Sequence, residues 1–149
     1  RSTLFPYTTL FRSNLRLAIA GVLAVKPKYL ILDEPVAGLD PVGRTRFMHL
    51  IRKLNKDGMT IIMVSHNADA IAECTDSLFI MRNGSILCSG NTREIFADAD
   101  MVRSCGIDVS RPRHIAEMLA DKGADISSNL ITYDDLLPEL IRIMERKNR

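Results

Sequence analysis

Short apolar runs alternate with stretches of helical spacing along most of the chain. The run YLIL at Tyr29–Leu32 leads into two acids, and the run MTIIMV at Met59–Val64 leads into Ser-His. Continuous apolar runs of this length are typical of strands buried on both faces of a parallel sheet. Between the two runs, apolar residues recur at helical spacing at Phe47, Leu50, Ile51 and Leu54. The order strand, helix, strand predicts a crossover unit whose two strands are parallel and adjacent.

Helix boundaries in the first half are marked by local chemistry. Asp40 can cap a helix whose first position is Pro41, and Asp57-Gly58 ends it. Upstream, residues 14–25 read NLRLAIAGVLAV, which is apolar nearly all round. This composition predicts a buried helix that stops before Pro27.

The second half predicts a hairpin followed by helices. A short helix is expected at Asn67–Glu73, and the strands 78–81 and 85–88 flank an Asn-Gly turn. Asn91 and Glu94 resemble a cap pair that opens another helix. Arg111–Asp121 and Tyr133–Lys147 are amphipathic, and Thr132 and Asp135 are candidate caps for the second of them. The expected fold is an α/β domain with a mainly parallel sheet, formed by residues 14–98, and a small helical extension at 99–149.

The apolar stripe of the last helix allows two interpretations. Its members are Leu136, Leu137, Leu140, Ile141 and Met144. Amphipathic helices usually bury such a stripe against their own domain, so local packing is the favoured expectation. Dimerisation or a regulatory contact is the alternative.

Residues 1–13 are treated separately. The peptide Thr3–Ser13, TLFPYTTLFRS, resembles the translation of a sequencing-library adapter, and Arg1 and Ser2 are assigned to the same artefact segment. Such a segment is excluded from fold reasoning. Removing Arg1 and Arg12 from the 20 basic residues leaves 18, equal to the 18 acidic residues, so the formal charge of +2 becomes zero. Net charge therefore gives no support for nucleic-acid binding.

Composition favours neither a membrane span nor a cysteine-based site. No apolar run approaches the roughly 20 residues that span a membrane, so membrane association is expected to come through a partner. The three cysteines, Cys74, Cys88 and Cys105, form no CxxC pair. They are interpreted as small buried hydrophobic residues of a reducing cytosol rather than as a metal or redox site.

The candidate chemistry lies where the two predicted strands end. Asp33 and Glu34 follow the first strand, and ligands of open α/β sheets bind at the carboxyl ends of strands. A carboxylate there can hold magnesium, and a neighbouring one can orient or deprotonate water. His66 follows the second strand and is expected beside Glu34, where it can donate a hydrogen bond to a phosphate oxygen. Alone, an apolar run followed by Asp-Glu is also compatible with two solvated strand-end acids.

The longer pattern LAIAGVLAVKPKYLILDEPVAGLDP, followed by MVSHN, resembles the C-terminal half of an ABC transporter nucleotide-binding domain. The Walker B strand matches Leu30–Glu34, the D-loop matches Ala37–Asp40 and the switch histidine matches His66. The segment from Asp76 to Phe96 resembles the end of this domain. The tail, with ITYDDLLPEL, is most similar to the energy-coupling factor or cobalt-type subfamily.

This resemblance implies roles for four residues. Asp33 would bind Mg2+, Glu34 would be the catalytic carboxylate, and His66 would contact the γ-phosphate of ATP. Asp40 would act at the interface with a second ATPase subunit, besides capping its helix. The family implies a peripheral protein on the cytoplasmic membrane face, with a transmembrane transporter subunit as partner, no nucleic acid, and vitamin or metal-ion uptake as the activity.

The chain also departs from the family pattern. None of its eight glycines is followed by Lys, so the G-x-x-x-x-G-K-[ST] phosphate cradle is missing, as are the Q-loop and the LSGGQ-type motif. The chain alone is therefore expected to be inactive and not to bind ATP tightly. A soluble ABC ATPase that does not drive transport, and a non-catalytic dimerisation or regulatory fragment, are the alternatives.

Overall fold

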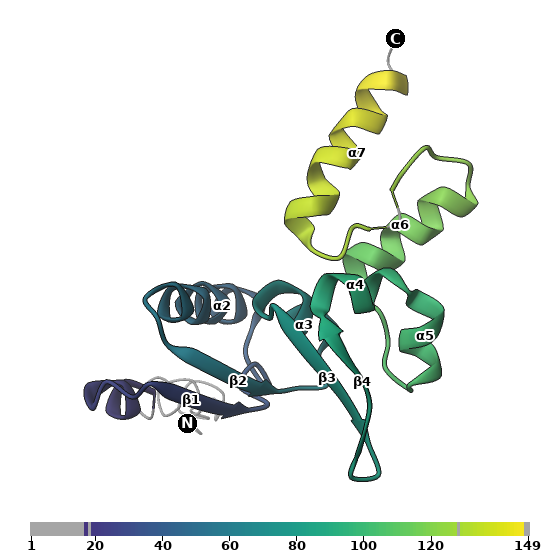
Figure 1. The fold of residues 1–149 in the computed structure, drawn as a ribbon. Helices are drawn as coiled ribbons and strands as arrows, with labels where there is room; N and C mark the ends of the chain where they lie inside the picture. Colours follow the sequence, from purple (N-terminus) through teal and green to yellow (C-terminus); the bar gives the residue numbers. More distant parts are fainter. Residues whose placement is uncertain (1–16, 18, 128, 148–149) are drawn as a thin grey trace, which may run out of the picture. The chain divides into compact units, whose positions relative to one another are not determined.

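The computed structural model describes residues 17, 19–127 and 129–147 (Figure 1). The artefact segment expected at residues 1–13 lies outside the described residues. The chain divides into two compact units, Arg1–Val64 and Ser65–Arg149, which are considered separately below. The domain boundary expected near residues 98–110 stays a prediction.

Unit 1 contains the expected crossover. Strand β1 (Tyr29–Asp33), helix α2 (Pro41–Lys56) and strand β2 (Thr60–Val64) follow one another. The two strands pair in parallel, in a register that runs from Tyr29 opposite Thr60 to Asp33 opposite Val64. Adjacent parallel strands are therefore confirmed. A helical segment at 19–24 precedes β1 and ends before Pro27, as expected.

Burial in unit 1 is one-sided, which corrects two predictions. Leu30 and Leu32 are buried, whereas Tyr29 and Ile31 on the opposite face of β1 are 68% and 70% exposed. Helix α2 packs against β2 and contributes its own buried residues, Phe47, Met48 and Ile51. Burial of both strand faces was wrong, because the apolar run alone does not show how many layers cover the sheet. The segment 19–24 is not a buried helix either: Ile19 is buried, but Val22 is exposed.

Unit 2 consists of a hairpin and five helices within its described residues. Their bounds are α3 (Ala68–Cys74), β3 (Ser77–Arg82), β4 (Ser85–Asn91), α4 (Thr92–Ala97), α5 (Ala99–Ser104), α6 (Arg111–Asp121) and α7 (Tyr133–Lys147). The strands are antiparallel, with an irregularity in register after Ile80. Asn83 and Gly84 have φ values of 51° and 76°, the left-handed conformation that a two-residue hairpin turn of this type requires.

The hairpin and the short helices share one core. Ile80 of β3, Ile95 of α4 and Val102 of α5 are each at most 7% exposed and belong to one apolar cluster. Phe96 is fully buried. Helix α5 was not predicted: it has six residues, too few for a periodic pattern, and the Asp98 carboxylate caps it by accepting from the Met101 N–H at 2.9 Å.

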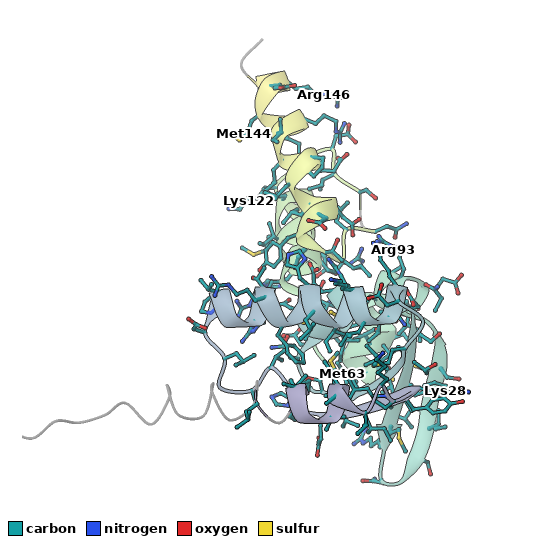
Figure 2. All side chains as sticks on the ribbon, turned by 90° about the vertical axis from the view of Figure 1, so that its left-hand side faces the viewer. Lys28, Met63, Arg93, Lys122, Met144 and Arg146 are labelled. Atoms are coloured by element: carbon teal, nitrogen blue, oxygen red, sulfur yellow. The ribbon has the colours of Figure 1, made fainter. Side chains whose placement is uncertain are left out.

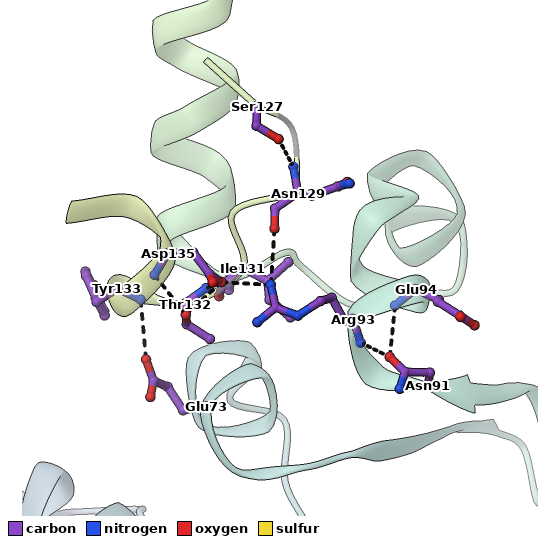
Figure 3. Close-up of polar contacts among 11 residues, drawn as sticks. Glu73, Asn91, Arg93, Glu94, Ser127, Asn129, Ile131, Thr132, Tyr133 and Asp135 are labelled. Carbon is purple, nitrogen blue, oxygen red and sulfur yellow. Dashed lines mark hydrogen bonds and ion pairs between the residues drawn. The ribbon is translucent and has the colours of Figure 1, made fainter. Parts of the chain in front are cut away.

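Polar contacts attach the start of α7 to the rest of unit 2 (Figure 3). The Thr132 hydroxyl donates to the Asp135 carboxylate at 2.7 Å, and the Asp135 N–H donates back at 3.2 Å. This confirms the predicted caps. Arg93 of α4 pairs with Asp135 at 3.0 Å, and the Tyr133 N–H reaches Glu73 of α3 at 3.4 Å. Burial raises the pKa of Asp135, but the hydrogen bonds from Thr132 and Arg93 outweigh it, so the net pKa is lowered.

The apolar stripe of α7 splits into two halves. Leu136 is 2% exposed and packs with Ala116 and Leu130, and Leu140 lies against the same cluster. The other half stays at the surface, with exposures of 55% to 65% at Leu137, Ile141 and Met144. In Figure 2, Met144 extends to one side of α7 and Arg146 to the other. Local packing is thus confirmed for half of the stripe and wrong for the other half, because the apolar arc is wider than the face that α6 covers.

Candidate functional site

The two strand-end acids lie at the carboxyl end of the parallel pair in unit 1. Asp33 is the last residue of β1 and stands opposite Val64, the last residue of β2. The next N–H, that of Glu34, donates to the Val64 carbonyl at 2.9 Å and extends the ladder by one bond. The Asp33 residue is exposed and Glu34 half-buried. The parallel pairing thus fixes the backbone from which both carboxylates project.

Glu34 has an unusual backbone conformation. Its φ is +42°, in the left-handed region that residues other than glycine and asparagine rarely adopt. Such a conformation costs on the order of 1–3 kcal/mol and persists where surrounding contacts hold it. Here the contacts are the bond to Val64 and a turn in which the Glu34 carbonyl accepts from the Ala37 N–H at 3.1 Å. Lys26 of unit 1 also has a positive φ, of +50°, but Glu34 is the one of the two that lies at the carboxyl end of a strand.

The loop after Glu34 leads to Asp40 and fixes its side chain. Val36 is 2% exposed and anchors the loop, while Gly38, at φ +71°, supplies the reversal. The Asp40 Oδ1 atom accepts from the Gly43 N–H at 2.9 Å, which confirms the predicted helix cap. An added Cβ at Gly43 would lie 2.6 Å from that same oxygen. In this conformation, a side chain at residue 43 would require the Asp40 carboxylate to shift.

His66 lies two residues beyond the end of β2 and belongs to unit 2. It is exposed, and the residues around it form a helix start. The Asn67 N–H donates to the Ser65 hydroxyl at 3.2 Å, and the Asn67 side chain caps α3 through the Ala70 N–H at 2.9 Å. The pairing of His66 with Glu34 stays a prediction, since the two residues belong to different units.

The side chains at the strand ends suit a magnesium site in which water and substrate phosphates supply most of the ligands, rather than a site formed by the protein alone. Mg2+ is usually held by one or two carboxylates together with waters and substrate phosphates. Asp33 offers one exposed carboxylate of that kind. No group of three or more His, Cys, Asp or Glu side chains among the described residues forms a metal cage. A cradle for the phosphates of ATP is not among the motifs of this sequence, so the chain's own residues fit only the carboxylate side of a Mg-ATP site.

Two features of the structure were not predicted from the sequence. The sequence could have indicated the close approach of Gly43 to Asp40, because a glycine stands three residues after a capping aspartate. The second feature is a cluster of sulfur atoms at Cys88, Met101 and Cys105 in unit 2. Met101 and Cys105 are four apart along the chain, which indicates a shared helix face, but nothing local brings Cys88 to them.

Across the described residues, no helix combines the length and apolar character needed to cross a membrane.

No protein-family profile matches the chain. Curated relatives match most of it. The energy-coupling factor transporter ATP-binding protein EcfA2 of Clostridium acetobutylicum is 42% identical over 135 residues, which are 90% of this chain and 47% of the relative. EcfA2 of Clostridium perfringens is 40% identical over 134 residues, 89% of this chain and 47% of the relative. The chain thus spans about half the length of these relatives.

Solved structures agree with the sequence matches. CbiO1 of Clostridium perfringens, described as part of the ABC transporter complex cbiONQ, superposes with a TM-score of 0.57 at 39% identity, over 74% of this chain and 43% of that one. The ATP-binding cassette MJ1267 of an ABC transporter gives a TM-score of 0.54 at 25% identity, over 62% and 38% of the two chains. Together these matches place the chain among the ABC transporter ATP-binding proteins, as a homologue that corresponds to about half of an energy-coupling factor subunit.

Proposed function

We propose that the whole protein to which this chain corresponds is the ATP-hydrolysing subunit of an ABC importer of the energy-coupling factor type, for a vitamin or a metal ion. The observation that carries this proposal is the pair Asp33 and Glu34 at the end of a parallel strand pair, with Glu34 held at positive φ. The identity of about 40% to energy-coupling factor ATP-binding proteins supports it.

Each candidate residue has a distinct task in this proposal. Bound Mg-ATP would supply the phosphoryl group and the charge that polarises it. The Asp33 carboxylate would hold the metal, and the Glu34 carboxylate would accept a proton from the attacking water. His66 donates a hydrogen bond to the γ-phosphate, which fixes its orientation. Asp40 acts at the contact with a second ATPase subunit while its Oδ1 atom continues to cap α2.

The proposed assembly rests on the similarity to energy-coupling factor ATP-binding proteins, about half of whose length this chain spans. In this proposal an N-terminal half would supply the phosphate cradle, and a second ATPase subunit would complete the site. Both would sit with a transmembrane subunit at the cytoplasmic membrane face. The chain by itself is proposed to be inactive.

A hybrid protein tests the role of Asp33. The N-terminal half of the Clostridium acetobutylicum relative is joined ahead of residues 14–149, and ATP hydrolysis is measured over a range of Mg2+ concentrations. We expect Asp33→Asn to raise the Mg2+ concentration needed for half-maximal turnover by at least about tenfold, because a ligating charge is lost. Glu145→Gln, which removes an exposed carboxylate on α7, is the matched control. An unchanged Mg2+ dependence in Asp33→Asn would remove Asp33 from the metal site.

The chain alone gives a second test. An ATP titration of the 149 residues is expected to show no Mg2+-dependent binding at micromolar concentrations, since the cradle is missing. Tight binding there would contradict the proposed division of the site.

A further inference from the structure

Three sulfur atoms from two elements of unit 2 meet at the edge of its core. Cys88 lies on β4, and Met101 and Cys105 lie on or just after α5. All three pack against the cluster that contains Ile80 and Val102. The Cys105 thiol donates to the Met101 Sδ atom at 3.9 Å. Cys105 also shares a hydrogen bond with the Cys88 side chain, so its sulfur contacts both of the others.

The backbones that carry these sulfurs are held in place. Cys88 stands opposite Ile80 in the hairpin ladder, and Ile80 is 1% exposed. The Cys105 N–H is shared between the carbonyls of Met101 and Val102, both at 3.1 Å. Val102 is fully buried. The three side chains are therefore brought together by packing and hydrogen bonds that need no ligand.

The separation of the Cys105 and Met101 sulfurs matches a three-coordinate site. Metal–thiolate bonds are about 2.3 Å long, so three sulfurs in a plane around one ion lie about 4.0 Å apart. The Cys105–Met101 separation of 3.9 Å agrees with this value. All three residues are half-buried, which leaves a path from solvent while keeping the sulfurs partly dry.

The ligand types specify the kind of ion. Thiolate and thioether sulfurs are soft ligands that select Cu(I) over hard cations. Burial, and after it the neighbouring Cys105, raises the pKa of Cys88, because two thiolates side by side in a partly dry place repel each other. The described residues contain no His, Cys, Asp or Glu group of three that offers a competing site.

We propose that Cys88, Met101 and Cys105 form a binding site for one Cu(I) ion. Each thiol releases its proton to solvent as its sulfur coordinates the ion, and the thioether donates a lone pair without losing a proton. The copper stays in the Cu(I) state, so no electron is transferred. The site is separate from the strand-end acids of unit 1 and does not depend on the proposed ATPase activity.

Cu(I) titration of the full chain tests this site. The titration is run without oxygen against a chromophoric Cu(I) chelator, with a phosphine reductant in place of thiols. We expect one ion per chain. Cys88→Ser and Cys105→Ser should each weaken binding by at least about 100-fold, the upper end of what the loss of a supporting group costs. Cys74→Ser, which removes the third cysteine, should leave the affinity within about twofold.

The thioether separates this proposal from a simple dithiol. Met101→Leu conserves the side-chain volume, so the variant is expected to fold, which circular dichroism checks. A change in copper binding then reports the loss of the thioether sulfur. X-ray absorption should show three sulfur neighbours around copper in the native chain and two in Met101→Leu, with an affinity lower by about tenfold. Equal affinities in these two proteins would overturn the three-sulfur site. Binding that is lost in Cys74→Ser, or that is absent from the native chain, would overturn it as well.

Discussion

Gly43→Ala should lack the stabilisation that usually follows when a glycine near the start of a helix is replaced by alanine. An alanine inside a helix is more favourable than glycine by about 1 kcal/mol. At position 43, however, the new Cβ would lie 2.6 Å from the Asp40 Oδ1 atom that caps α2. Displacing that cap costs about 1 kcal/mol. We therefore expect Gly43→Ala alone to give no stabilisation of α2.

The magnitude follows from a double-mutant cycle. Asp40→Ala should destabilise α2 by about 1 kcal/mol through loss of the cap. In the Asp40→Ala background the clash is gone, so Gly43→Ala should now stabilise by about 1 kcal/mol. The coupling between the two positions is then about 1 kcal/mol, larger than the roughly 0.3–0.5 kcal/mol within which distant sites add.

Hydrogen exchange of the α2 amides is the assay, because it reports on this helix alone. Gly21→Ala is the matched control: Gly21 lies in the helical segment 19–24, and nothing lies within 4 Å of an added Cβ. It should slow exchange in its own segment. If Gly43→Ala slows exchange in α2 equally with and without Asp40, the contact that fixes Asp40 is not the one described.

Three further predictions concern unit 2. The pKa of Asp135 is lower in the folded chain than in the unfolded chain. Its ionised carboxylate therefore stabilises the fold above the unfolded pKa of about 3.9, and this stabilisation is lost as pH falls through the folded value. Asp135→Asn should flatten the dependence of the unfolding free energy on pH in that range, and an unchanged slope would contradict the lowered pKa. Glu117→Gln should destabilise the chain by about 2 kcal/mol in denaturant unfolding, because this carboxylate pairs with the buried Arg113. A change near zero would mean that this pair contributes little. Phe96→Ala should cost about 3–5 kcal/mol, since the ring is fully buried, whereas Phe79→Ala at a 62% exposed position should cost far less, and similar losses for both would contradict the described core.

The helices of unit 2 show which part of a fold is readable from sequence. The expected ranges for α6 and α7 agree with the structure, because their boundaries are set by local chemistry such as the Thr132–Asp135 caps. Helix α5 was missed since its six residues show no period. One-sided burial of β1 was also missed. An apolar strand sequence does not show whether one face or both faces of the strand are packed against other elements. Only the structure shows that β1 is buried on one face.

The sequence likewise predicted some features of the candidate site and not others. The position of Asp33 and Glu34 at a strand end, and the capping role of Asp40, followed from neighbouring residues. The positive φ of Glu34 did not, because it depends on the bond to Val64 from another strand. The sulfur cluster needed the contact between the hairpin and α5, which no spacing along the chain reveals.

ATP hydrolysis by Glu34→Gln in the hybrid protein tests the central claim most directly. Glutamine keeps the size of the side chain but cannot accept a proton from water. The account predicts that turnover falls by about 10²- to 10⁴-fold, the usual contribution of a general base, while Mg-ATP still binds. The Glu145→Gln control should hydrolyse ATP at the unmodified rate. Turnover by Glu34→Gln equal to that of the control would contradict the assignment of Glu34 as the catalytic carboxylate.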